Sequence, residues 1–198
     1  MRNAGSSGRS LAALLSLVLA ACAAVPYRER PAVDPAAIEA FRLDGRINLL
    51  VHKQAFPGRV RWQHSPEMDE LWFFSPVGAT VARLRQDGSG ALLVTSEGRE
   101  YRAADLEQLA FDVLGWDLPI QGLPFWVSGL TWPGADVERE ERDDRSRVTR
   151  LRQAGWQVTY LDWAAAGASG LPSKLDLQGE RLRMRLVIER WSVNGHGR

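Results

Sequence analysis

The sequence predicts a mainly β domain: a strongly curved antiparallel sheet of about ten strands, with a helical insert that covers its concave side. Three observations lead to this fold class. Apolar and polar residues alternate with a period of two along most segments between residues 41 and 189. Turn signals such as Asp87-Gly88 separate these segments at the spacing of hairpins. A helical period interrupts the series once, between residues 105 and 130.

Six strands are expected before the helical insert. In the first, charged or polar side chains alternate with Phe41, Leu43, Ile47, Leu49 and Val51. Five more are expected at residues 59–63, 71–74, 80–86, 91–95 and 99–103. Asp34 and Pro35 have the residue types of an N-cap and a first helical position, so a short helix is predicted over residues 35–41.

The insert predicts two helices. In the first, apolar side chains recur at helical spacing, at Leu106, Leu109, Ala110, Val113 and Leu114. Asp105 can cap its N-terminus and Gly115 ends it. The second helix begins near Pro124, and residues 125–130 leave little polar face to show to water. We therefore expect the second helix to lie against an apolar surface.

Four strands are expected after the insert, at residues 148–153, 156–163, 174–178 and 181–189. The last is the longest, and its apolar face consists of Leu182, Met184, Leu186 and Ile188. The charged stretch at residues 136–147 is interpreted as a solvated hairpin tip. Residues 164–170 are interpreted as a loop, and residues 195–198 as a frayed end.

The N-terminus has the layout of a secretory signal. Arg2 and Arg9 give a basic start, residues 11–19 are apolar, and two alanines precede Cys22, the only cysteine of the chain. The apolar run is too short to span a bilayer. Residues 19–22, Leu-Ala-Ala-Cys, resemble the lipobox of bacterial lipoproteins. An ordinary signal peptide with a chance cysteine is the alternative interpretation.

The lipobox resemblance implies a division of the chain. Residues 1–21 would be a cleaved leader, Cys22 the acylated N-terminus, residues 22–34 a flexible tether, and residues 35–194 the folded domain. In lipoproteins an Asp directly after the cysteine tends to retain the protein at the inner membrane. Ala23 stands there, so the resemblance implies a lipid anchor in the outer membrane, on its periplasmic face.

Composition and motifs give no sign of catalysis or of nucleic-acid binding. The 25 basic and 24 acidic residues nearly cancel, so no basic excess points to nucleic acid. Hydrolase, phosphate-loop and zinc-protease motifs do not occur, and no cofactor is expected. His52 and His64 lie on separate expected strands without a third ligand, so no metal site is expected. We therefore expect a protein that is not an enzyme.

Several segments of the mature chain resemble the LolB family, the outer-membrane lipoproteins that receive other lipoproteins. They include "FRLDGRINLL", "LWFFSPVGAT", "LGWDLPIQGLPFWVSGL", "LRQAGWQVTY" and "RLRMRLVIERW". The resemblance implies an unclosed antiparallel β-barrel of about ten or eleven strands, with a helical lid over a hydrophobic cavity. It also implies a monomer that accepts lipoproteins from a LolA-type periplasmic carrier, holds their acyl chains and inserts them into the outer membrane.

Two groups of residues are candidates for this function. The candidates for the lining of the acyl-chain cavity are Trp62, Phe73, Leu109, Trp126 and Leu130, and each could instead be ordinary core. The turn Pro76-Val77-Gly78 carries a β-branched apolar residue at its tip, where polar residues are usual. The family resemblance implies that this tip touches the membrane during delivery. The alternative is a tip folded back into the core.

Two other functions stay open on the sequence alone. The chain could be a structural outer-membrane lipoprotein that binds a protein partner through its eight tryptophans. It could also be a membrane-anchored hydrolase, which would need a polar cluster in its cavity. An acyl chain bound to the domain in a native mass spectrum would distinguish the receptor from both.

Overall fold

The computed structural model describes residues 34, 36, 38–51, 53–116, 118–164 and 170–194. Several sequence-based predictions concern residues outside these ranges. They are the leader at residues 1–21, the acylation of Cys22, the tether up to residue 33, and the frayed end at residues 195–198.

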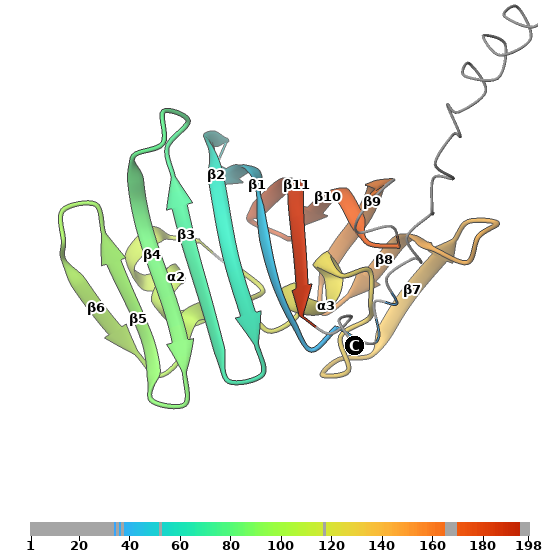
Figure 1. Cartoon of the computed structure of the whole chain (residues 1–198), viewed down its shortest axis with the longest axis horizontal. Helices are drawn as coiled ribbons and strands as arrows, with labels where there is room; N and C mark the ends of the chain where they lie inside the picture. The colour runs from blue at the N-terminus through green and yellow to red at the C-terminus, as the bar shows by residue number, and fades with distance from the viewer. Residues whose placement is uncertain are drawn as a thin grey trace, which may run out of the picture.

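The described chain forms one antiparallel sheet of eleven strands, in the order β6-β5-β4-β3-β2-β1-β11-β10-β9-β8-β7. The strands before the helices are β1 (Ala40–Val51), β2 (Gln54–Ser65), β3 (Met68–Phe74), β4 (Thr80–Asp87), β5 (Gly90–Thr95) and β6 (Glu100–Ala103). Those after them are β7 (Val137–Arg142), β8 (Val148–Gln153), β9 (Trp156–Trp163), β10 (Pro172–Gln178) and β11 (Leu182–Asn194). Figure 1 shows β1 beside β11 at the centre of the sheet, with β6 and β7 at its two edges. Because β6 and β7 do not pair, the barrel is unclosed, as the family resemblance implies.

Strand alternation decides which side chains fill the concave side. In β11 the buried residues are Leu182, Met184, Leu186 and Ile188, and their neighbours in the sequence face outward. The same period buries the expected residues of β1. Each strand predicted from this period is present, with bounds that differ by a few residues.

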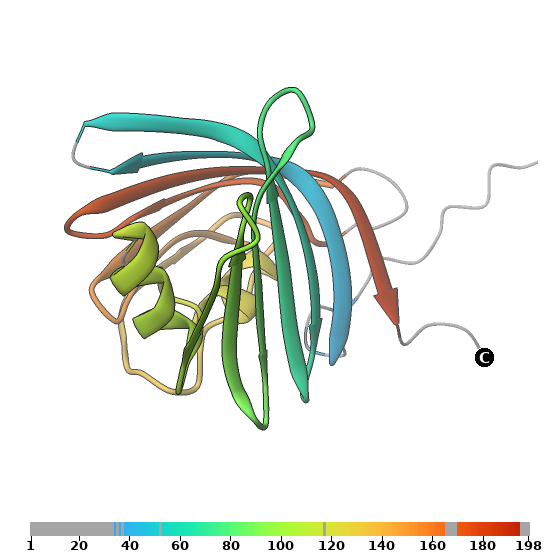
Figure 2. The same cartoon turned by 90° about the vertical axis from the view of Figure 1, so that its left-hand side faces the viewer.

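A bulge bends the centre of the sheet. The pairing of β1 with β11 shifts register between Asp44 and Gly45. A side chain at Gly45 would collide with the backbone oxygen of Val187, so only glycine fits here. Bulges increase the local bend and twist of a strand pair. Figure 2 shows the resulting curvature, with the sheet curling around the helices.

Two short helices pack inside the curve. Helix α2 (Leu106–Leu114) begins at Asp105, whose side chain accepts from the Gln108 backbone N–H at 2.8 Å, and ends at Gly115 with φ 68°. It contacts β4, β5 and β6. Helix α3 (Leu123–Val127) has four buried residues out of five, as its apolar sequence predicts. Neither of these two described helices is long and apolar enough to cross a membrane.

The helix predicted over residues 35–41 is wrong at its C-terminal end. Strand β1 begins at Ala40, and Phe41 lies opposite His64 on one side and Val193 on the other. Phe41 is buried there, so pairing with two strands outweighs the local helix signal. Asp34 still forms the expected local bond, because its Oδ1 accepts from the Ala36 N–H at 3.0 Å.

The charged stretch at residues 136–147 was predicted to be a hairpin tip, and this prediction is wrong for its first half. Residues 137–142 form the edge strand β7, and only residues 143–147 form the turn to β8. Charged side chains pair across the two strands, with Arg152 and Glu138 2.9 Å apart and Arg150 and Glu141 3.1 Å apart. Charged edges of this kind discourage pairing with other chains.

Candidate functional site

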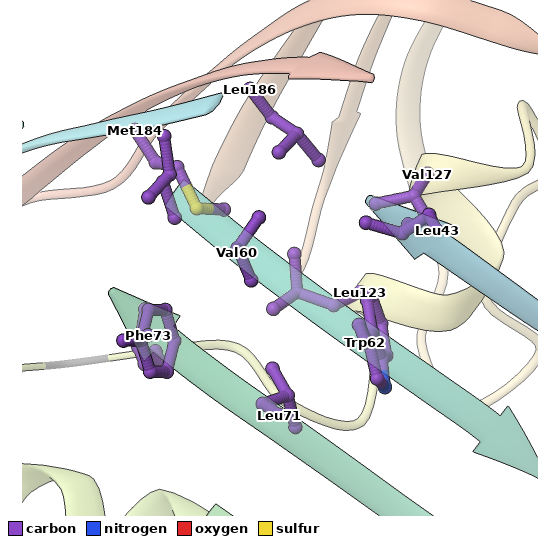
Figure 3. Close-up of a pocket in the computed structure, with 11 residues that line it drawn as sticks. Leu43, Val60, Trp62, Leu71, Phe73, Leu123, Val127, Met184 and Leu186 are labelled. Atoms are coloured by element: carbon purple, nitrogen blue, oxygen red, sulfur yellow. The ribbon is translucent and has the colours of Figure 1, made fainter. Parts of the chain in front are cut away.

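A small apolar pocket lies between the concave face of the sheet and α3. It is lined by Leu43, Ile47, Val60, Trp62, Leu71, Phe73, Leu118, Leu123, Val127, Met184 and Leu186. Figure 3 shows Leu123 and Val127 of α3 together with the side chains that the strands contribute. The only polar side-chain atom in this set is the indole nitrogen of Trp62, which donates to Asp69 Oδ1 at 2.7 Å. The pocket therefore suits an apolar ligand.

Strand register brings the lining residues together. Leu43 lies opposite Trp62, and Trp62 lies opposite Leu71, so three strands contribute one row. Val60 lies opposite Phe73 in the next row. Residues directly opposite each other on neighbouring strands share a face, so the inward period of two makes a continuous apolar surface.

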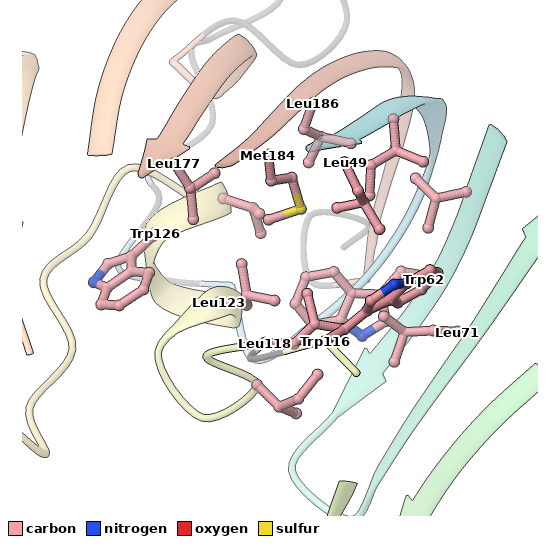
Figure 4. Close-up of a cluster of buried hydrophobic side chains, with 14 of the residues drawn as sticks. Leu49, Trp62, Leu71, Trp116, Leu118, Leu123, Trp126, Leu177, Met184 and Leu186 are labelled. Carbon is pink, nitrogen blue, oxygen red and sulfur yellow. The ribbon is translucent and has the colours of Figure 1, made fainter. Parts of the chain in front are cut away.

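The pocket is nearly closed in this conformation. Its volume is about 30 Å³, enough for a water molecule or two and too small for a hydrocarbon chain. Figure 4 shows Leu123 of α3 packed toward Met184 and Trp62, which fills the space between helix and sheet. An elongated apolar ligand could enter only if the lid residues moved away from the sheet.

Helix α3 is tied to β8 by a buried glutamine. Gln153 Oε1 accepts from Trp126 Nε1 and from the Trp132 N–H, both at 2.9 Å. Gln153 Nε2 donates to the carbonyl oxygens of Trp132 at 2.6 Å and Ala135 at 2.7 Å. All four hydrogen-bonding positions of the amide are therefore used, as a fully buried amide requires.

A tyrosine on β9 adds a second tie to α3. The Tyr160 hydroxyl donates to the carbonyl oxygen of Trp126 at 2.9 Å. Burial raises the pKa of Tyr160, so the phenol keeps its proton and remains a donor. Gln153 and Tyr160 together fix the C-terminal end of α3, which carries Trp126.

Helix α2 is attached to the other half of the sheet. The Leu106 N–H donates to Gln86 Oε1 of β4 at 3.0 Å, and the Gln121 N–H donates to Glu107 Oε1 at 3.1 Å. Leu109 is buried on the helix face that meets the strands, whereas Phe111 is 49% exposed. The lid thus has two attachments, α2 on β4–β6 and α3 on β8 and β9. The pocket residue Leu118 lies in the connection between the two helices, and Leu123 begins α3.

The structure brings some of the predicted cavity residues together and places others elsewhere. Trp62 and Phe73 line the pocket. Leu109 is buried on the face of α2 that meets the strands, and Leu130 is half-buried in the segment that follows α3. Trp126 is fully buried on the far side of α3, with its ring 6.5 Å from that of Trp156 (Figure 4). These three residues are not among the pocket lining.

The lid residues that line the pocket were not among the residues predicted from the sequence. Leu123 and Val127 are four residues apart, the spacing that places two side chains on one face of a helix. That spacing was the available signal. From the strands, Met184 and Leu186 were assigned to an apolar face but not to a pocket.

The turn between β3 and β4 exposes an apolar tip. Val77 is 92% exposed, so the tip is not folded back into the core. The Gly78 N–H donates to the Ser75 carbonyl at 2.9 Å, and the Ser75 N–H donates to the Ala79 carbonyl at 2.8 Å. Gly78 has φ 91°, which glycine adopts without strain. Figure 2 shows this turn projecting beyond the sheet.

Polar side chains near the pocket form hydrogen bonds with one another. His64 Nδ1 and Asp69 Oδ1 are 2.8 Å apart, and Asp69 Oδ1 also accepts from Trp62. Within the described part of the chain, no group of three or more His, Cys, Asp and Glu side chains is placed to hold a metal ion. His52 lies outside the described residues.

An unclosed half-barrel with helices in its concave side and an apolar pocket beneath them defines a class of proteins suited to holding apolar ligands. Residues 39–191 match the family model described as "Outer membrane lipoprotein LolB". The chain therefore belongs to the LolB family.

Curated relatives agree with this membership, and a solved structure shares the fold. The outer-membrane lipoprotein LolB of Nitrosomonas europaea is 41% identical over 157 residues, which cover 78% of this chain and 74% of that protein. The LolB of Azoarcus sp. strain BH72 is 34% identical over 193 residues, 98% of this chain and 99% of that protein. A crystal structure of a DUF1329 family protein from Desulfovibrio piger shares the fold, with TM-score 0.54 and 7% identity, covering 83% of this chain and 89% of that one.

Proposed function

We propose that this chain is an outer-membrane lipoprotein receptor. It accepts lipoproteins from a LolA-type periplasmic carrier, holds their acyl chains between the sheet and the lid, and inserts them into the outer membrane. The observation that carries the proposal is the apolar pocket between the concave sheet face and α3 in a member of the LolB family. The mechanism assigns no catalytic residue, metal or cofactor.

Acyl chains supply the free energy that opens the lid. Each buried methylene contributes about 0.8 kcal/mol, so a chain of a dozen or more methylenes contributes roughly 10 kcal/mol. Separating Leu118 and Leu123 from the strands exposes only the apolar area of a few side chains, at roughly 25 cal/mol per Å². Occupancy by an acyl chain can therefore offset the cost of the open conformation.

The lid opens on the side of Leu118 and Leu123. Trp126 is held by Gln153 and Tyr160, so the end of α3 beyond Leu123 stays on β8 and β9. The connection between α2 and α3 has fewer ties to the sheet, and movement there widens the pocket without breaking the Gln153 network. No nucleotide motif occurs in the chain, so transfer runs down an affinity gradient from carrier to receptor to bilayer.

The N-terminus places the receptor at its membrane. The relatives bear the name outer-membrane lipoprotein LolB, and the lipobox-like residues 19–22 support cleavage before Cys22. Acylated Cys22 anchors the chain on the periplasmic face of the outer membrane, residues 22–34 act as a tether, and residues 35–194 form the receptor domain. A monomer suffices, because the pocket is built from one chain.

Delivery uses the turn between β3 and β4. The hydrogen bonds of Ser75 hold the turn in one shape, so the exposed Val77 tip flanked by Pro76 and Gly78 can enter the lipid interface. One valine contributes about 1.5 kcal/mol when fully buried, so the tip guides docking but does not hold the protein on the bilayer.

A transfer assay tests the proposed function. A LolA-type carrier loaded with a labelled lipoprotein is mixed with the receptor, and label on the receptor is measured after the two are separated. We expect label to pass to the receptor and then to liposomes. A receptor that stays unlabelled, and that shows no bound acyl chain in a native mass spectrum, would instead support a structural or partner-binding lipoprotein.

A further inference from the structure

A groove with basic walls lies on the convex face of the sheet and reaches the Val77 turn. Its lining includes Arg46, Arg59, Lys174 and Arg185, together with Pro76 of the turn. The groove has a volume of about 510 Å³, and no carboxylate is among the residues that line it. We call this feature the basic groove.

Strand register connects the basic groove to the turn. Lys174 lies opposite Val187, Val187 opposite Arg46, Arg46 opposite Arg59, and Arg59 opposite Phe74. Residues directly opposite each other share a face, so one row of side chains crosses five strands. The row contains three cations and ends at Phe74, the last residue of β3 before the turn.

Two of these cations share a single carboxylate. Arg46 and Arg59 are direct cross-strand neighbours, an arrangement that destabilises a sheet when the charges are alike. Glu189 compensates both, because its Oε1 is 2.9 Å from Arg46 Nε and its Oε2 is 2.8 Å from Arg59 Nη2. The three side chains together keep one positive charge.

The remaining cations differ in their partners. Arg185 makes a two-pronged pair with Asp176, with both nitrogen–oxygen distances 2.6 Å. Lys174 makes no ion pair among the residues that the structure describes, although Asp162 lies opposite it on β9. The Asp162 side chain accepts instead from the Trp163 N–H at 2.9 Å. Three of the four cations are thus paired with two carboxylates, Glu189 and Asp176, and Lys174 is the fourth. The four cations and two carboxylates together leave two net positive charges along the groove.

We propose that the basic groove binds the phosphate groups of anionic phospholipids when the Val77 turn meets the bilayer. The inference deepens the proposed function and rests on it, since it assigns a lipid class to the delivery step. Anionic headgroups attract cations that lie within a Debye length of the membrane surface. A single exposed valine offers too little apolar area to orient the domain, whereas a row of cations beside it fixes which face lies on the membrane.

The inference is tested by binding of the protein to lipid vesicles. The protein is the whole mature chain with Cys22→Ala, secreted with a signal peptide that does not lead to acylation, so that no lipid anchor contributes. Co-sedimentation is measured with vesicles of phosphatidylcholine alone and with vesicles that also contain phosphatidylglycerol. We expect binding to the second kind only, and weaker binding as salt rises. Lys174→Glu should lower this binding at least about fivefold, the effect of losing one cation near an anionic bilayer.

Two further variants serve as controls. Arg145→Glu makes the same charge change in the turn between β7 and β8, outside the basic groove, and should change binding less than about twofold. Lys174→Gln removes the cation without adding an anion and should give an intermediate loss. Thermal unfolding of each variant shows whether a loss of binding reflects a loss of fold.

Three results would overturn the inference. One is equal binding to both kinds of vesicle, and another is an equal loss for Lys174→Glu and Arg145→Glu. The third is unchanged vesicle binding in Lys174→Glu together with impaired uptake from the carrier, which would make the basic groove a protein-docking surface. Uptake of acyl chains from the carrier tests the proposed function separately, because the pocket lies on the opposite face of the sheet.

Discussion

The indole Nε1 of Trp126 donates a hydrogen bond to Gln153 Oε1 at 2.9 Å, and neither side chain has any exposed surface. The bond joins the lid helix α3 to strand β8. Because Gln153 also bonds the backbone of Trp132 and Ala135, one side chain holds both α3 and the chain that follows it. The position of the lid over the pocket therefore depends on a residue outside the pocket.

Replacement of Gln153 tests this dependence. Gln153→Leu keeps a similar volume but leaves the buried indole N–H of Trp126 and the half-buried backbone groups of Trp132 and Ala135 without their partner. We expect the free energy of unfolding to fall by about 3 kcal/mol or more, as measured by urea denaturation. Gln157→Leu, an exposed change on β9, is the matched control and should stay within about 0.5 kcal/mol of the wild type. Similar losses in both variants would contradict the role of Gln153.

Leu123 tests the pocket. Leu123→Asp places a carboxylate against the apolar lining, where an unpaired charge is costly, so acyl binding should fall at least about tenfold. Displacement of a fluorescent fatty acid measures the affinity. Phe111→Asp puts the same group on the exposed side of α2 and should leave the affinity nearly unchanged. If both variants bind equally well while folded, the acyl chains lie elsewhere.

Val77 tests the delivery step. Val77→Glu should leave folding and uptake from the carrier nearly intact, because the tip contacts neither the core nor the pocket. Insertion into liposomes should slow, since a carboxylate is costly to place in the lipid interface. The two stages are scored separately, with Val81→Glu on the neighbouring strand β4 as control. Equal damage to uptake and insertion by Val77→Glu would assign the turn to docking with the carrier.

Cys22 tests the anchor. Cys22→Ala should yield a protein that is not acylated but still folds, because the core is built from residues 41 to 188. Such a protein should accept acyl chains from the carrier and deliver them poorly, since it is no longer held near the bilayer. Mass spectrometry of the wild-type N-terminus checks the modification directly. An unmodified Cys22 in the mature wild-type protein would contradict the anchor.

Much of the fold could be predicted because inward and outward residues alternate along each buried strand. The alternation in β1 and β11 is complete enough to identify both segments as strands and to show which side chains face the core. Strand β7 was missed because it is an edge strand without a buried residue, and its charged side chains form ion pairs with β8 where an apolar alternation would otherwise show. The helix predicted over residues 35–41 extended too far because pairing of Phe41 with two distant strands, which a local pattern does not contain, overrides a helix signal at Pro35.

The candidate site could be predicted only in its strand half. Alternation alone places Trp62 on the inner face of β2. Residues 71–74 are apolar throughout, so alternation gives Phe73 no face, and its position opposite Val60 brings it into the pocket lining with Trp62. The rotation of α3 depends on Gln153 and Tyr160, which are 27 and 34 residues from Trp126 in the sequence. A five-residue apolar helix has no polar face to reveal that rotation, so the sequence could not show that Trp126 lies on the far side from Leu123.

Photo-crosslinking of a bound acyl chain tests the central claim most directly. A fatty acid with a photoreactive group is bound to the full-length receptor and irradiated, and the labelled peptides are identified by mass spectrometry. We expect label on peptides from α3 and from the inner faces of β1, β2 and β11, and a loss of this label in Leu123→Asp but not in Phe111→Asp. Label confined to the convex face, or equal label in wild type and Leu123→Asp, would contradict an acyl-chain site between the sheet and the lid.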